Sequence, residues 1–158
     1  MNDATPASTP GPAPPPPRIY RAMRRDPNGN LPVVGTTSSS ELGARPGPDV
    51  TIDQVGNVVL DGKGMSVAPA WRDLPYTRIP RRLNGLFPGA AGSNANSCFV
   101  LGAGPFQASA VTADLELIPD AGPPPVRHGV VAPARVMTEG QYNGALAATR
   151  PDWVIDET

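Results

Sequence analysis

Cysteine and histidine, which often bind metals or take part in catalysis, each occur only once in this 158-residue chain. A single cysteine, Cys98, excludes an internal disulfide and the multi-cysteine zinc patterns. A single histidine, His128, argues against a histidine-based metal site, and a Ser-His-Asp triad has no other histidine to use. The G-x-S-x-G elbow of many serine hydrolases is also missing. We therefore expect no bound metal.

Long apolar segments are missing as well. No apolar run approaches the ~20 residues that a membrane-spanning helix needs. The first residues lack the charged start and the apolar core of a signal peptide. These features predict a soluble protein that is made in the cytoplasm and has no membrane partner. Export into a target cell would have to use a route without a cleaved signal.

Charge is nearly balanced, with a formal net charge of −1, but its distribution is uneven. Lys63 is the only lysine, and eight of the twelve arginines form two groups. The groups are Arg18, Arg21, Arg24 and Arg25, then Arg72, Arg78, Arg81 and Arg82. A GC-rich genome would explain the missing lysines but not this grouping. The near-neutral balance argues against nucleic-acid binding, which would show as a strongly salt-dependent interaction.

Proline is abundant, with 22 residues, and glycine contributes 17, whereas aromatic residues make up only 5%. The chain length suits one domain. Residues 1–17 are small, polar and proline-rich, and we expect them to form a disordered tail. Residues 18–158 are expected to fold, with a core of small and aliphatic side chains and much irregular backbone.

Short apolar runs predict the strands of this domain. The runs lie at 19–23, 49–52, 58–60, 65–67, 98–101, 108–118 and 126–132. Caps among residues 36–40 suggest a short helix through Glu41 and Leu42. One longer helix starts at Thr138, where Thr138 and Gln141 match a capping box, and Pro151 ends it. We therefore expect a compact α+β domain with a mixed sheet of short strands, few helices and long loops.

The stretch 61–83 concentrates glycine, serine, tryptophan and arginine, residue types that bind flat or anionic ligands. Arg21, earlier in the chain, shares one face of its predicted strand with Ile19 and Met23. If that face is buried, Arg21 must pair with an anion or line a pocket. The alternative is that this face meets solvent and Tyr20 packs inside.

The sequence does not match the common nucleotide-binding and glycosidase motifs. Gly62 and Lys63 suggest a P-loop, but Asn57 stands where the motif opens with glycine, and Gly64 stands where Ser or Thr is required. Gly102-Ala103-Gly104 lacks the third glycine of a dinucleotide fingerprint. Paired glutamates are missing, so a glycosidase is not supported.

An arginine on an early strand and a serine on a short strand after glycines resemble the NAD pocket of mono-ADP-ribosyltransferases. The chain is most similar to the cytotoxin family of the type VI secretion system that is built on that fold. The matching patches, in order, are residues 19–22 (IYRA), 49–50 (DV), 64–67 (GMSV) and 131–134 (VAPA), then Met137, Tyr142 and Leu146. They span most of residues 18–153 as short patches, not as continuous identity.

This resemblance implies that Arg21 contacts the phosphates or ribose of NAD and that Ser66 supports the nicotinamide pocket. Tyr20, Trp71 and Arg72 are further candidate NAD-binding residues, although Tyr20 and Trp71 could equally belong to the core. No Glu-x-Glu or Gln-x-Glu motif exists, so the catalytic glutamate is unassigned. Glu139 is the nearest candidate, but a glutamate at the start of a helix also stabilises that helix, so its presence does not require a catalytic role.

Two hypotheses follow. The first is an NAD-dependent antibacterial toxin whose pocket a partner immunity protein must neutralise in the cell that makes it. The second is a non-enzymatic binding or adaptor module tethered by its proline-rich tail, in line with the missing glutamate. The NAD-pocket hypothesis makes one structural prediction, which is that Arg21 and Ser66 lie near each other in the folded domain.

Overall fold

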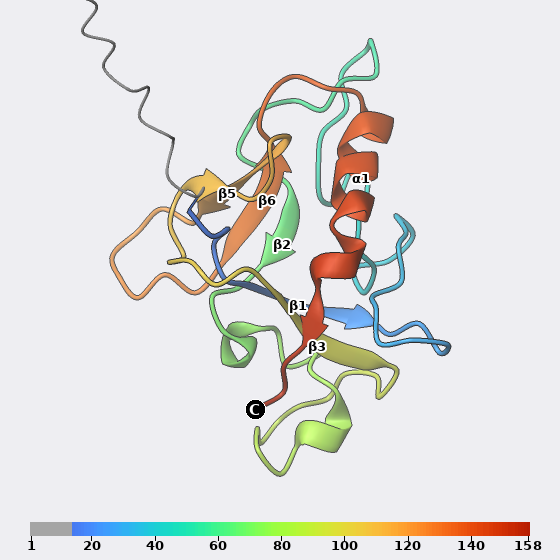
Figure 1. Ribbon diagram of the computed structural model, residues 1–158, viewed down its shortest axis with the longest axis vertical. Helices are drawn as coiled ribbons and strands as arrows, with labels where there is room; N and C mark the ends of the chain where they lie inside the picture. Colours follow the sequence, from blue (N-terminus) through green and yellow to red (C-terminus); the bar gives the residue numbers. More distant parts are fainter. Residues whose placement is uncertain (1–13) are drawn as a thin grey trace, which may run out of the picture.

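The computed structural model describes residues 14–158 and contains two small antiparallel sheets (Figure 1). The first sheet has the order β1-β3-β7, and the second has the order β2-β6-β5-β4. The strands are β1 (Ile19–Arg24), β2 (Met65–Val67), β3 (Asn96–Leu101), β4 (Ser109–Ala110), β5 (Leu115–Pro119), β6 (Gly129–Pro133) and β7 (Val154–Ile155). All pairings between these strands are antiparallel, whereas the sequence suggested a mixed sheet.

The helices are short, as the glycine and proline content suggested. The helices are α1 (Glu139–Ala148) and the 3-10 turns η1 (Trp71–Asp73), η2 (Arg81–Leu83) and η3 (Arg150–Asp152). An α+β domain of short strands with few helices is therefore present. None of the helices in residues 14–158 has both the length and the apolar character to cross a bilayer.

Helix α1 begins as its sequence predicts. The Gln141 N–H donates to Thr138 Oγ1 at 3.1 Å, and the Thr138 N–H donates to Gln141 Oε1 at 3.0 Å. This reciprocal pair is the expected capping box, which satisfies two of the unpaired donors at the helix start. The helix ends at Ala148, and Pro151 lies in the 3-10 turn that follows.

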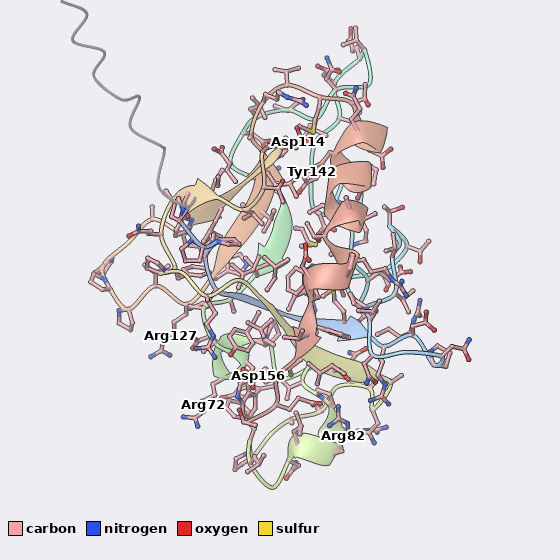
Figure 2. All side chains as sticks on the ribbon, in the orientation of Figure 1. Arg72, Arg82, Asp114, Arg127, Tyr142 and Asp156 are labelled. Carbon is pink, nitrogen blue, oxygen red and sulfur yellow. The ribbon has the colours of Figure 1, made fainter. Side chains whose placement is uncertain are left out.

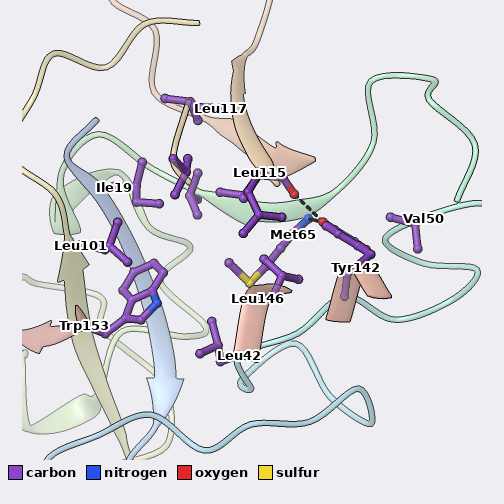
Figure 3. Close-up of a cluster of buried hydrophobic side chains, with 14 of the residues drawn as sticks. Ile19, Leu42, Val50, Met65, Leu101, Leu115, Leu117, Tyr142, Leu146 and Trp153 are labelled. Atoms are coloured by element: carbon purple, nitrogen blue, oxygen red, sulfur yellow. Dashed lines mark hydrogen bonds between the residues drawn. The ribbon is translucent and has the colours of Figure 1, made fainter. Parts of the chain in front are cut away.

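The main hydrophobic core lies between the two sheets and α1 (Figure 3). Its largest fully buried side chains include Trp153, Tyr142 and Phe99. The Tyr142 hydroxyl donates to the Val131 carbonyl and accepts from the Met65 N–H at 3.1 Å. Tyr142 thus attaches α1 to both β2 and β6 and fixes the position of β2.

A second hydrophobic cluster covers the other face of β1 and β3. It consists of Tyr20, Ala22, Ala68, Trp71, Leu74, Ile79, Leu83, Ala90, Cys98 and Val100. Strand β1 is consequently buried on both faces, and only its last residue, Arg24, is exposed. The two alternatives for this strand, Arg21 buried or Tyr20 buried, are both realised.

The two sheets meet where β1 passes the end of β2. The Tyr20 N–H donates to the Ala68 carbonyl at 2.7 Å, and the Ala68 N–H donates to the Tyr20 carbonyl at 2.9 Å. This single bridge joins segments that are 48 residues apart in the chain. It brings Arg21, the next residue of β1, beside Ser66 of β2.

The region around Glu41 is irregular, so the short helix suggested there was wrong. The Glu41 carboxylate accepts from the N–H groups of Thr37 and Ser38 at 3.1 and 2.8 Å, and Arg24 Nη2 donates to it at 3.2 Å. Burial would raise the pKa of Glu41, but the bonds from Thr37 and Ser38 together hold it below its usual value. A carboxylate that takes backbone donors in this way folds the segment into a turn.

The proline run ends in contact with the domain. Pro16 accepts from the N–H groups of Ala103 and Gly104 at 3.1 and 2.8 Å. A Cβ added at Gly102 would lie 2.1 Å from the Pro17 carbonyl oxygen, so only glycine allows this approach. The contacts of the domain extend to Pro16, two residues before the boundary suggested by the sequence; residues 1–13 of the expected tail lie outside the described part.

Candidate functional site

Arg21 and Ser66 lie side by side, which confirms their expected proximity. Arg21 Nη1 donates to the Ser66 carbonyl at 2.8 Å, although 45 residues separate the two in the chain. Both side chains line one cavity at the junction of β1 and β2. The hydroxyl of Ser66 forms no hydrogen bond with any residue of 14–158 and is therefore available to a ligand.

Arg21 is almost completely buried, with 3% of its surface exposed. Besides Ser66, its guanidinium donates to the Glu41 carbonyl from Nε (3.2 Å) and Nη2 (3.0 Å) and to the Ser39 carbonyl from Nη2 (2.9 Å). A guanidinium has five N–H donors, so one donor remains. Burial lowers the pKa of Arg21 to about 10, with a further contribution from the nearby Arg78. Arg21 mainly ties β1, β2 and the 39–41 segment together.

The cavity has a volume of about 130 Å³. It is lined by Arg21, Ala22, Ser66, Val67, Ala68, Leu74, Pro75, Arg78 and His128. Pockets that enclose a whole small-molecule ligand are typically about 300–1,000 Å³, so this one can enclose only one group of a larger ligand. Its walls combine apolar side chains with two guanidinium groups.

Arg78 is a lining residue whose role the sequence did not reveal. It lies between η1 and η2 and is partly buried. Its guanidinium has no hydrogen-bond acceptor in the described part of the chain, although its carbonyl accepts from Asn96 Nδ2 at 3.2 Å. Burial lowers the pKa of Arg78, and the charge of Arg45 lowers it further. An unpaired, partly desolvated cation favours the approach of an anion.

His128 is the second residue that sequence reasoning missed as part of this site. Its Nδ1 lies 2.9 and 3.0 Å from the two carboxylate oxygens of Asp120. That contact favours a proton on Nδ1 and leaves Nε2 as the free ring nitrogen. Val130 of β6 is paired with Ser66, which explains why His128, two residues earlier, borders the same cavity. This register could not be read from sequence alone.

Glu139 is not part of the cavity lining. It occupies the first turn of α1, where its Oε1 accepts from Asn143 Nδ2 at 3.0 Å. That Asn143 side chain also bonds the backbone of Ala44 in both directions. The structure thus gives Glu139 a role at the helix start and does not bring it to Arg21 and Ser66.

The other three candidates, Tyr20, Trp71 and Arg72, do not line the cavity. They line a separate surface hollow of about 220 Å³, here called the C-terminal hollow, together with Arg18, Pro69, Ala70 and Thr158. Figure 2 shows Arg72 and Asp156 below β1, and Tyr142 above it. The structure therefore divides the predicted NAD site into two separate places, the cavity and the C-terminal hollow.

The polar groups of the C-terminal hollow are bonded to the end of the chain. The Tyr20 hydroxyl donates to Asp156 Oδ2 at 2.6 Å, and Trp71 Nε1 donates to the Thr158 carbonyl at 2.8 Å. Burial raises the pKa of Tyr20, and its bond to Asp156 raises it further. The Arg72 guanidinium is exposed and lies 5.9 Å from the centre of the Trp71 ring. This hollow anchors the last residues.

The described residues offer few side chains that could bind a metal ion together. Within residues 14–158, no group of three or more His, Cys, Asp or Glu side chains could hold a metal ion. Cys98 is buried, and burial raises its pKa to about 12, so its thiolate is not available at neutral pH.

Comparison with known proteins gives no further assignment: no family model, no curated protein sequence and no solved structure matches the chain.

Proposed function

We propose that the cavity between β1 and β2 binds the nicotinamide end of NAD and that the domain transfers or hydrolyses ADP-ribose. The observation that carries this proposal is the placement of Arg21 and Ser66 at one cavity, the two residues that the resemblance to ADP-ribosyltransferase toxins assigns to the NAD pocket. Arg21 lies on β1 and Ser66 on β2, two strands that are far apart in the sequence and meet at the cavity.

The chemistry of the cavity suits a small aromatic amide. Leu74, Pro75 and Ala68 supply apolar walls, and Ser66 supplies a free hydroxyl that can bond an amide group. The volume of about 130 Å³ accommodates one ring and not a whole dinucleotide. The remainder of NAD would lie outside along the rim, towards Arg78.

The reaction breaks the bond between the ribose C1′ and the nicotinamide N1, and the electron pair of that bond moves to the nicotinamide ring. An acceptor hydroxyl or water forms the new bond to C1′ and releases its proton. Nε2 of His128 is the free basic nitrogen at the cavity and accepts that proton in the proposed reaction. Glu139 has no part in this scheme because it lies outside the cavity.

A non-enzymatic binding module is the second candidate, and one observation favours it. Four of the five Arg21 donors are used by backbone carbonyls, so Arg21 has little capacity left for a ligand. In this case the cavity binds NAD or a related group without turnover.

A toxin would in addition need a partner protein that blocks the cavity in the producing cell.

Inducible expression of the full chain in bacteria tests the proposal. We expect expression to lower cellular NAD and to arrest growth, and Ser66→Ala to weaken both effects. Ser93→Ala, an exposed serine in the 84–95 loop, is the matched control. Unchanged NAD in wild-type cells, together with no calorimetric heat on addition of NAD to the purified protein, would overturn the proposal. Heat without NAD consumption would favour the binding module.

A further inference from the structure

The cavity has an uncompensated positive charge. Two of its lining residues, Arg21 and Arg78, are cations, and none of the lining residues is Asp or Glu. The electrostatic field at the cavity therefore favours an anionic ligand over a neutral one.

Asp49 is the carboxylate whose charge acts on both arginines, and it is already paired with Arg45. Asp49 attracts Arg21 and Arg78 electrostatically, but its oxygens accept from Arg45 Nε at 3.0 Å and from Arg45 Nη2 at 3.3 Å. The Arg45 N–H also donates to Asp49 Oδ2 at 2.7 Å. Because Asp49 and Arg45 neutralise each other, the charges of Arg21 and Arg78 remain.

The two remaining arginines differ in their capacity to bind a ligand. Arg21 has one free N–H after its four bonds to carbonyls. All five donors of Arg78 are without an acceptor among residues 14–158. Arg78 is also only partly buried, so a ligand that extends from the cavity into solvent can reach it.

The backbone of Arg78 is held firmly, which keeps the side chain at the cavity. The Arg78 N–H donates to the Pro75 carbonyl at 2.9 Å, and Asn96 Nδ2 donates to the Arg78 carbonyl at 3.2 Å. On its other side, a Cβ added at Gly92 would lie 2.5 Å from the carbonyl carbon of Arg78. This packing fixes the backbone from which the Arg78 side chain extends beside the cavity.

We propose that Arg78 binds a phosphate or diphosphate group of the ligand at the mouth of the cavity, while Arg21 is a positioning residue that holds the two strands. The guanidinium of Arg78 can bond two phosphate oxygens in parallel, which a lysine cannot do. That the diphosphate belongs to NAD rests on the proposed function; the anion site itself does not.

Calorimetry with the full chain tests this inference, with inorganic pyrophosphate, ADP-ribose and nicotinamide as separate probes. We expect Arg78→Ala to weaken pyrophosphate and ADP-ribose binding by about tenfold to a hundredfold, the usual range for hydrogen bonds to charged groups. Nicotinamide carries no phosphate, so its affinity should not change. Arg78→Lys should recover part of the loss because it restores the charge without the planar fork.

Arg81→Ala is the matched control, because Arg81 is an exposed arginine three residues later that does not line the cavity. Thermal unfolding checks that the variants fold, and Arg78→Gln, which keeps most of the aliphatic stem, replaces the alanine variant if that one does not. Equal affinity of wild type and Arg78 variants for pyrophosphate and ADP-ribose overturns the inference, as does no binding of either probe to wild type.

The same experiments separate this inference from the proposed function. If pyrophosphate binding depends on Arg78 but NAD is neither bound nor consumed, the anion site stands and the NAD function falls. If NAD is consumed equally well by wild type and Arg78→Ala, the function stands and the role of Arg78 falls.

Discussion

The cavity between β1 and β2 and the C-terminal hollow are each lined by two arginines but differ in how most of their polar groups are bonded. In the hollow, Tyr20 and Arg18 bond Asp156, and Trp71 bonds Thr158. In the cavity, Ser66 and Arg78 have free side-chain polar groups within the described residues. Arginine and aromatic residues near one another are thus not sufficient for a site. The hollow also contains a guanidinium without a hydrogen bond in the described residues, that of Arg72, but Arg72 is exposed, whereas Arg78 is partly buried. A partly desolvated donor without a partner therefore distinguishes the cavity from the hollow.

The largest effect is expected from Arg21→Ala. The substitution leaves the carbonyls of Ser39, Glu41 and Ser66 without their buried donor and opens a cavity. We expect the free energy of unfolding to fall by about 3 kcal/mol or more. Urea unfolding followed by circular dichroism measures it. Loss of NAD binding with full stability would contradict this, because it would make Arg21 a ligand contact and not a strand clamp.

Asp156→Asn should have the next largest effect, confined to the C-terminal hollow. Bonds from Tyr20, Thr158 and Arg18 hold the pKa of Asp156 below its usual value. A carboxylate with a lowered pKa in the folded state stabilises the protein above its unfolded pKa of about 3.9, and this stability is lost as the pH falls through the folded value. We therefore expect wild type to lose stability below about pH 4 and the variant to lose less over that range.

At neutral pH, Asp156→Asn should cost about 2 kcal/mol, since it weakens hydrogen bonds to a charged acceptor. Unfolding free energies at several pH values give both results. Parallel pH profiles of wild type and variant would show that Asp156 does not anchor the end of the chain, and the interpretation of the hollow would then be wrong.

Tyr20→Phe should lower the free energy of unfolding by about 1 kcal/mol, because it removes the hydroxyl that donates to Asp156 and leaves the buried ring in place. Affinity for NAD and for ADP-ribose should stay unchanged, since Tyr20 does not line the cavity. Calorimetry beside unfolding separates the two effects. A marked fall in NAD affinity would return Tyr20 to the binding site and erase the distinction between the two regions.

Ser66→Ala should change stability least, by less than about 0.5 kcal/mol, because its hydroxyl has no partner in residues 14–158. Its effect should appear instead in the affinity for nicotinamide and NAD. A titration of the variant with nicotinamide gives the sharpest comparison. A large loss of stability without a change in affinity would make Ser66 a structural residue like Tyr20.

Local parts of this fold were predictable from the sequence. The Thr138 capping box, the strand that contains Tyr20 and Arg21, and the strand that contains Ser66 all appear where the sequence indicated them. Their signals are local, because caps and apolar alternation depend on residues a few positions apart. The helix suggested at Glu41 failed because its carboxylate bonds the preceding backbone and forms a turn.

The site was predictable only in part. Arg21 and Ser66 could be named from their patches, but Arg78 and His128 could not, because their place depends on chain segments that meet only in three dimensions. Tyr20, Trp71 and Arg72 were grouped with the site since they lie close to it in sequence. The structure places them at the C-terminal hollow instead, so closeness along the chain did not predict closeness in space.

The sequence by itself determined the capped start of α1, the strands β1 and β2, the scarcity of metal-binding residues and the identity of two residues at the cavity. Only the tertiary structure decided that β1 is buried on both faces and that backbone carbonyls, not a carboxylate, receive the charge of Arg21. The reason is physical. A buried charge must be satisfied by whatever groups the distant strands and loops bring to it, and that arrangement follows from long-range packing and not from local propensity.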